Sequence, residues 1–154
     1  MTTEMRISRH AMFMEMAHVV AKRSTCLRLN VGAVAVVGKT PVSIGYNGAP
    51  PGMPHCTYHT CSPSSPCKQT VHAEVNALER AGVARGIDMY VTHSPCPACF
   101  DHMWATGRVN RIFFGTPFRE IEHLTGSLFE IDVYRVLPSG IVIDWTTGVP
   151  LDAS

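Results

Sequence analysis

Residues 71–115 read VHAEVNALERAGVARGIDMYVTHSPCPACFDHMWATGRVNRIFFG, and this stretch decides the fold. It alternates two helical patterns with two short apolar runs. The first predicted helix covers residues 71–81, and the second covers residues 97–106. Each is followed by a glycine, and the second has proline in its first turn, where proline is tolerated. The predicted strands are residues 88–92 and 110–115. Because strand–helix–strand crossovers join parallel strands, the stretch predicts a parallel pair.

Outside this stretch the patterns are shorter. Met12, Met16, Val19 and Val20 recur at helical spacing and predict the apolar stripe of a first helix. The other predicted elements are a helix at 9–23, a hairpin of strands 31–37 and 41–46, a long loop at 47–69, a helix at 120–130, and strands at 132–137 and 141–145. Together they predict an α/β fold, with a mixed sheet of about five strands between helices, in one domain over residues 1–154.

The bulk composition excludes several classes of protein. The net charge of +1 argues against a nucleic-acid binder, which is usually clearly basic. The sequence has no apolar run near the ~20 residues that span a bilayer, and its start has no secretory pattern, so we expect a cytoplasmic protein without membrane contact. In that reducing compartment, six cysteines indicate metal binding or catalysis before disulfides.

Two short motifs open the two helices of the quoted stretch. His72 and Glu74 form H-x-E, and Cys96 and Cys99 form P-C-x-x-C. Two cysteines three apart at a helix start lie on one side, and His72 adds a ligand from the other helix. Three protein ligands leave the fourth position of zinc open for water, whose pKa zinc lowers. Glu74 is then the expected proton shuttle, and the combined pattern is the signature of zinc-dependent nucleobase deaminases.

Each motif alone has a simpler interpretation. H-x-E is common in proteins, and C-x-x-C also occurs in redox centres and structural zinc sites. Their order, their positions at two helix starts and the prolines around Cys96 favour a catalytic zinc site over a purely structural one.

Four further cysteines remain: Cys26, Cys56, Cys61 and Cys67. Four thiolates can close a structural zinc site, which would order an irregular loop rich in Gly, Pro and Ser. His55 and His59 are alternative ligands, and the four thiols could instead be buried as small apolar side chains. We favour a second zinc.

Several segments, in the same order along the chain, resemble the deoxycytidylate (dCMP) deaminase family of the cytidine deaminase-like superfamily. The resemblance covers residues 10–120 and excludes the tail. It is carried by Arg23-Ser24-Thr25-Cys26, Val31-Gly32-Ala33-Val34, Gly45-Tyr46-Asn47-Gly48-Ala49-Pro50, His55-Cys56, His72-Ala73-Glu74-Val75-Asn76-Ala77 and Ser94-Pro95-Cys96-Pro97-Ala98-Cys99.

The resemblance implies a three-layer α/β/α fold and hydrolysis of dCMP to dUMP. By the same resemblance, Asn47 would bind the sugar, the Ala73 N–H and the Ser94 carbonyl would contact the cytosine edge, and Phe118 would stack near the base. The residues expected near the 5′-phosphate are Ser24, Arg23 and Arg119. Solvated surface charge is the alternative reading of the two arginines.

The resemblance also implies a homo-oligomer, with a hexamer favoured. Members regulated by dCTP and dTTP carry an arginine where this chain has Val83, so effector control is not predicted.

Three alternatives to dCMP deamination remain open. The substrate could be a 5-substituted dCMP, because one methyl group changes binding by only ~1–3 kcal/mol. The chain could also be a polynucleotide deaminase acting on tRNA adenosine or single-stranded DNA cytidine, or a non-catalytic zinc-stabilised interaction module.

Overall fold

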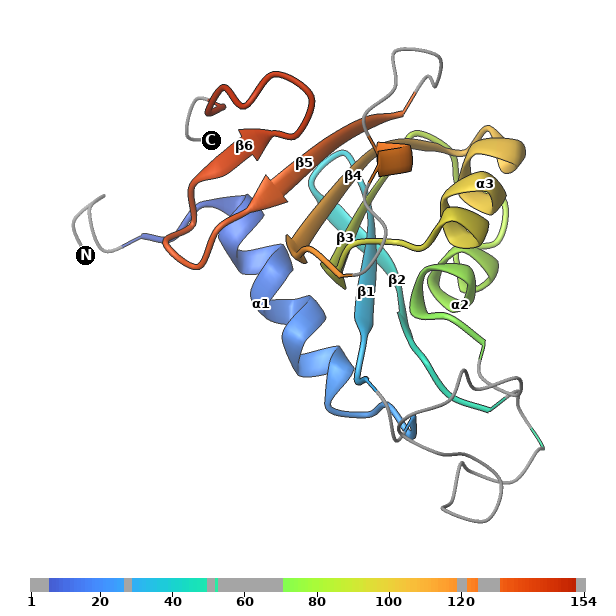
Figure 1. Ribbon diagram of the computed structural model, residues 1–154. Helices are drawn as coiled ribbons and strands as arrows, with labels where there is room; N and C mark the ends of the chain where they lie inside the picture. Colours follow the sequence, from blue (N-terminus) through green and yellow to red (C-terminus); the bar gives the residue numbers. More distant parts are fainter. Residues whose placement is uncertain are drawn as a thin grey trace.

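The structure is a computed structural model that describes residues 6–26, 29–49, 52, 71–118, 122–124 and 131–151. A mixed sheet forms its centre, with helix α1 on one face and helices α2 and α3 on the other (Figure 1). The three-layer α/β/α fold expected from the sequence is confirmed. The helices are α1 (Arg9–Ala21), α2 (Ala73–Arg80), α3 (Pro97–Thr106) and a 3-10 helix (Glu122–Leu124).

Six strands join one sheet in the order β2-β1-β3-β4-β5-β6. Their bounds are β1 (Gly32–Val37), β2 (Thr40–Tyr46), β3 (Ile87–His93), β4 (Val109–Thr116), β5 (Asp132–Val136) and β6 (Val142–Asp144). The pairs β3–β4 and β4–β5 are parallel, as the crossovers predict, whereas β1–β2, β1–β3 and β5–β6 are antiparallel. All six predicted strand segments join this sheet, one more than the count of about five expected for it, and the short strand β6 pairs with β5 at one edge.

The two faces of the sheet carry two separate cores, because successive residues of a strand point to opposite faces. In β1, Ala33 and Ala35 pack towards α2 and α3, whereas Val34 and Val36 pack towards α1. Strand β3 is buried along almost its whole length, as expected for a strand covered by helices on both faces. The end of β3 that leads into α3 is therefore held on both sides.

Helix α1 buries a different stripe from the one predicted. Met12 is 39% exposed and Val19 is 63% exposed, whereas the buried side chains are Phe13, Met14, Ala17 and Ala21. At its C-terminal half, the backbone of α1 approaches Gly32 of β1 closely, and the small residues Ala17 and Ala21 lie at this contact. Met16 and Val20 of the predicted stripe are half-buried and pack against the same core, so the buried face is the predicted stripe rotated about the helix axis.

Other boundaries also differ from the sequence-based expectation. The predicted helix 71–81 begins two residues later, because Val71 forms a bridge with Gly48 and His72 has extended backbone angles. Within the predicted helix 120–130, the described residues 122–124 form a single 3-10 turn. Most of the predicted loop 47–69 lies outside the described residues. Within the described part of the chain, no helix is both long and apolar enough to cross a bilayer.

Candidate active site

The first turns of α2 and α3 place the H-x-E and P-C-x-x-C motifs at one end of the sheet. His72 is the N-cap residue of α2 and Cys96 is that of α3, and both have extended backbone angles. An N-cap side chain usually accepts a hydrogen bond from its own helix, as Ser8 does in α1. Neither His72 nor Cys96 does so, and their side chains turn towards a shared point instead.

Three ligand atoms meet at that point. His72 Nδ1 lies 2.8 Å from Cys99 Sγ and 3.5 Å from Cys96 Sγ. All three atoms lie within 4.8 Å of one another. His72 is exposed, Cys96 is half-buried and Cys99 is buried, so the cluster opens towards solvent on the histidine side. The structure therefore brings together the three side chains that the motifs predicted as metal ligands.

The donor set fits zinc. Zinc bonds of ~2.0–2.1 Å to nitrogen and ~2.3 Å to sulfur give tetrahedral edges of about 3.5 to 3.8 Å. The 3.5 Å separation of His72 and Cys96 equals such an edge, whereas the 2.8 Å separation of His72 and Cys99 is shorter, so these two side chains would move apart around an ion that binds all three atoms. One imidazole and two thiolates are also the ligand types that zinc prefers, and three of them leave one position open.

The two cysteines differ in their affinity for a proton. Hydrogen bonds from Cys99 and then His72 lower the pKa of Cys96 to about 3, against the opposing effect of burial. In the same pairing Cys99 keeps its proton, and the bond to Cys96 together with burial raises its pKa. A bound divalent cation favours the thiolate form of both. The arrangement of the three side chains therefore favours the thiolate form at Cys96.

Glu74 lies in the first turn of α2 beside this cluster. Its side chain is 3% exposed. Burial raises the pKa of Glu74, although a hydrogen bond with Cys99 and the charge of His72 oppose the shift. A buried carboxyl group with a raised pKa can exchange protons near neutral pH, as a general acid–base group must.

Asn47 and Ser24, both predicted to contact the substrate, form a hydrogen-bonded junction within the protein. The Ser24 hydroxyl lies 2.5 Å from Asn47 Oδ1, which also accepts a bond of 2.8 Å from the Val31 amide. Asn47 Nδ2 donates to the Leu29 carbonyl at 2.6 Å. Asn47 is 6% exposed and joins the end of β2 to the segment between α1 and β1. Its side chain thus also has a structural role that the sequence did not reveal.

The other predicted substrate contacts surround the same end of the sheet. Ala73 is the first residue of α2, so its N–H has no intrahelical partner. Ser94 is buried and lies two residues before Cys96, and its hydroxyl group is bonded to the backbone of Phe118. Arg23 is exposed at the end of α1. Cys26 is half-buried, whereas Cys56, Cys61, Cys67 and Arg119 lie outside the described residues.

One residue near the site was missed by sequence reasoning. His123, in the 3-10 helix, donates a hydrogen bond of 2.8 Å from Nε2 to the carbonyl group of Pro95, immediately before Cys96. Its ring also meets Phe100 of α3 edge-on, with centroids 5.7 Å apart. No motif links residues so far apart in sequence, so only the fold reveals this support of the Cys96 turn.

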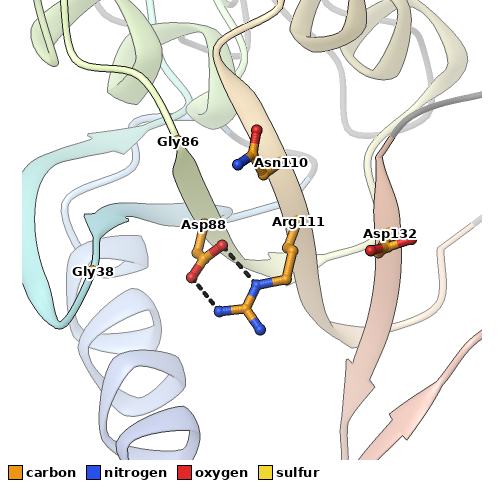
Figure 2. A pocket seen from close by; sticks show the side chains of 6 residues that line it. All are labelled: Gly38, Gly86, Asp88, Asn110, Arg111 and Asp132. Carbon is orange, nitrogen blue, oxygen red and sulfur yellow. Dashed lines mark hydrogen bonds and ion pairs between the residues drawn. The ribbon is translucent and has the colours of Figure 1, made fainter.

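A separate hollow lies at the opposite end of the strands. Figure 2 shows the paired Asp88 and Arg111 on neighbouring strands, with Asp132 on β5. The guanidinium group of Arg111 donates two bonds to the Asp88 carboxylate, at 2.8 and 2.6 Å. These residues lie near the starts of β3, β4 and β5, whereas Cys96 follows the end of β3. The hollow is therefore distinct from the His72–Cys96–Cys99 cluster.

The chain is similar to known proteins in sequence and in fold. ComE operon protein 2 of Bacillus subtilis is 37% identical over 119 residues, which are 74% of this chain and 62% of that protein. The chain thus spans less than two thirds of that relative. Deoxycytidylate deaminase of Mycobacterium phage D29 is 36% identical over 120 residues, covering 66% of this chain and 90% of the phage protein.

The dCMP deaminase of cyanophage S-TIM5 has a solved structure that superposes with a TM-score of 0.68 at 26% identity, over 88% of this chain and 99% of that one. A second structure of that enzyme contains dCMP and dUMP. The profile of the cytidine and deoxycytidylate deaminase zinc-binding region matches residues 7–116, which contain the whole metal cluster and Glu74. By this match, this protein belongs to the family of cytidine and deoxycytidylate deaminases that share that zinc-binding region.

Proposed function

We propose that this protein is a zinc-dependent deaminase that hydrolyses dCMP to dUMP. One observation carries the proposal: a buried carboxyl group, Glu74, lies beside a cluster of His72, Cys96 and Cys99 that fits zinc. A structural zinc site needs no buried proton carrier, whereas hydrolytic removal of an amine does. The similarity to deoxycytidylate deaminases and to the cyanophage enzyme with dCMP and dUMP favours this substrate.

The reaction consumes one water and releases one ammonia. Zinc, when bound, supplies Lewis-acid activation of the attacking water. Glu74 takes a proton from that water as its oxygen bonds to C4 of cytosine, and gives the proton to ring nitrogen N3. Glu74 then moves a second proton from the attacking oxygen to the exocyclic amine, which leaves as ammonia when the C4–N4 bond breaks. The burial of Glu74 limits the loss of these protons to solvent.

The substrate contacts belong to the same proposal. The unpaired N–H of Ala73 and the carbonyl of Ser94 are assigned to the cytosine edge, and the ring of Phe118 to the face of the base. Asn47 is assigned to the sugar. Because the Ser24 hydroxyl donates to Asn47 within the protein, Ser24 is better suited to hold Asn47 than to donate to a phosphate. Arg23, exposed near Ser24, and Arg119 remain the proposed phosphate contacts.

The experiment compares substrates by release of ammonia. The panel contains dCMP, 5-methyl-dCMP, CMP, deoxycytidine, dCTP and a short oligonucleotide containing cytosine. We expect the highest kcat/KM with dCMP or its 5-methyl derivative. Turnover of the oligonucleotide alone would instead identify a polynucleotide deaminase. Zinc binding without turnover of any cytosine or adenine compound would identify a non-catalytic zinc module.

We further infer a second, structural zinc held by Cys26, Cys56, Cys61 and Cys67. The half-buried, unpaired Cys26 lies next to the Ser24–Asn47 junction, where a metal would tie the following segments to the sheet. We expect two zinc ions per wild-type chain and one in Cys26→Ser, measured by elemental analysis after dialysis. The matched variant Cys99→Ser should also lose one zinc, but from the other site. One zinc in both the wild type and Cys26→Ser would refute the second site.

The proposal also includes a homo-oligomer, for which the family resemblance favours a hexamer, and it leaves control by dCTP or dTTP to experiment. A cytoplasmic location agrees with the thiolate ligands, which need a reducing compartment. Mass determination in solution, with and without these nucleotides, tests the assembly.

A further inference from the structure

The end of strand β3 is bonded to the segment that follows β4. Ser94 Oγ accepts a hydrogen bond of 2.8 Å from the Phe118 amide and donates one of 3.3 Å to the Phe118 carbonyl. The Ser94 amide also donates to the Thr116 carbonyl at 2.9 Å. Ser94 is 6% exposed, and both of its hydroxyl bonds to Phe118 are partly buried. One hydroxyl group thus fixes both backbone polar groups of Phe118.

The aromatic ring of Phe118 has its own neighbour on β3. His93 faces it edge-on, with ring centroids 6.1 Å apart and planes inclined by 79°. The Phe118 side chain is nevertheless 37% exposed. One part of the ring is therefore supported by the protein and another is accessible from outside. Because Ser94 is two residues before Cys96, this accessible ring lies at the end of the sheet that carries the metal cluster.

We propose that Ser94 is a positioning residue. Its hydroxyl group holds Phe118 in place, so that the phenyl ring can pack against the base of the substrate. This inference rests on the proposed function and deepens it. Any residue at position 94 could offer a backbone carbonyl to the cytosine edge. The Ser94 hydroxyl group also accepts from the Phe118 amide and donates to the Phe118 carbonyl, which an aliphatic side chain at this position could not do.

The inference separates two roles of one residue. The carbonyl of Ser94 would contact the substrate, and its side chain would act through Phe118. Removing the hydroxyl leaves the Ser94 carbonyl in place but breaks the bond from the Phe118 amide. The segment after β4 would then lose its fixed position, while the ligands His72, Cys96 and Cys99, which make no bond to the Ser94 hydroxyl, would keep theirs.

The test combines Ser94→Ala with Phe118→Ala in a double-mutant cycle. A typical net hydrogen bond predicts a rise of about three- to tenfold in KM for dCMP in Ser94→Ala, with a smaller change in kcat. In the Phe118→Ala background, Ser94→Ala should add almost nothing, because the ring that it positions is gone. Ser94→Thr, which keeps a hydroxyl, should retain most of the wild-type KM. Thr116→Val removes a hydroxyl from an exposed neighbour and should leave KM unchanged.

A second readout needs no turnover. Hydrogen exchange at the Phe118 amide should be faster in Ser94→Ala than in the wild type and in Thr116→Val. Equal KM effects of Ser94→Ala with and without the Phe118 ring would overturn the positioning role, as would unchanged exchange at Phe118. If the wild type turns over no dCMP, the proposed function fails and the substrate role of Phe118 fails with it. Hydrogen exchange at Phe118 does not depend on turnover, so it would still show whether the Ser94–Phe118 bond exists when dCMP is not a substrate.

Discussion

Replacement of Glu74 by glutamine should lower kcat for dCMP by about 10²- to 10⁴-fold, the usual contribution of a positioned general acid–base group. The upper part of this range is expected, because the same carboxyl group would handle both proton transfers. Glutamine has nearly the size of glutamate but cannot carry a proton between water, ring and amine. It is also neutral, so Glu74→Gln leaves no buried charge without a partner and should not reduce stability.

The matched control is Glu79→Gln, the same substitution at an exposed position of α2. Both variants should keep the zinc content and the Tm of the wild type, and only Glu74→Gln should lose turnover. Steady-state kinetics, metal analysis and thermal unfolding measure the three quantities. Retention of more than about a tenth of wild-type kcat by Glu74→Gln would rule out Glu74 as the proton carrier.

The metal cluster was predictable because its signal is local. The spacings within H-x-E and P-C-x-x-C predict ligands displayed at two helix starts, and the known pairing of these motifs in zinc deaminases, beyond spacing alone, predicted that His72, Cys96 and Cys99 meet. The parallel pairing of β3 with β4 also followed from local patterns, since a helix between two strands requires a crossover.

What could not be predicted depends on contacts between distant segments. The Ser24–Asn47 bond spans 23 residues and the His123–Pro95 bond spans 28, and neither has a characteristic spacing. The buried face of α1 contacts a glycine in another element, Gly32, which no periodicity within the helix reveals. Sequence patterns report which residues an element can bury, whereas the partner decides which of them it does bury.

Substitution of Gly45 by alanine should strongly destabilise the fold, because α2 packs directly on this glycine of β2. A Cβ atom at position 45 would lie 2.3 Å from the Ala73 carbonyl oxygen and 2.4 Å from the Ala77 amide nitrogen. Both are backbone atoms, so the helix itself must move. Overpacking of this kind costs about 3 kcal/mol or more, which corresponds to a fall in Tm of roughly 6–12 °C.

The site should respond as well, because α2 begins directly after His72 and carries Glu74, whereas Cys96 and Cys99 belong to α3. Displacement of α2 alone separates the imidazole from the two sulfurs, so Gly45→Ala should lose zinc to a chelator faster than the wild type does. Gly32→Ala is the matched control, since its Cβ would lie 2.0 Å from the Ala17 carbonyl oxygen in α1, on the other face of the sheet. Gly32→Ala should lower Tm by a similar amount yet retain zinc. Thermal unfolding measures Tm, and metal analysis after dialysis against the chelator measures zinc, at a temperature below the Tm of both variants. Equal zinc loss from both variants would mean that moving α1 disturbs the metal cluster as much as moving α2 does. A wild-type Tm for Gly45→Ala would show that α2 does not pack on β2 as closely as described.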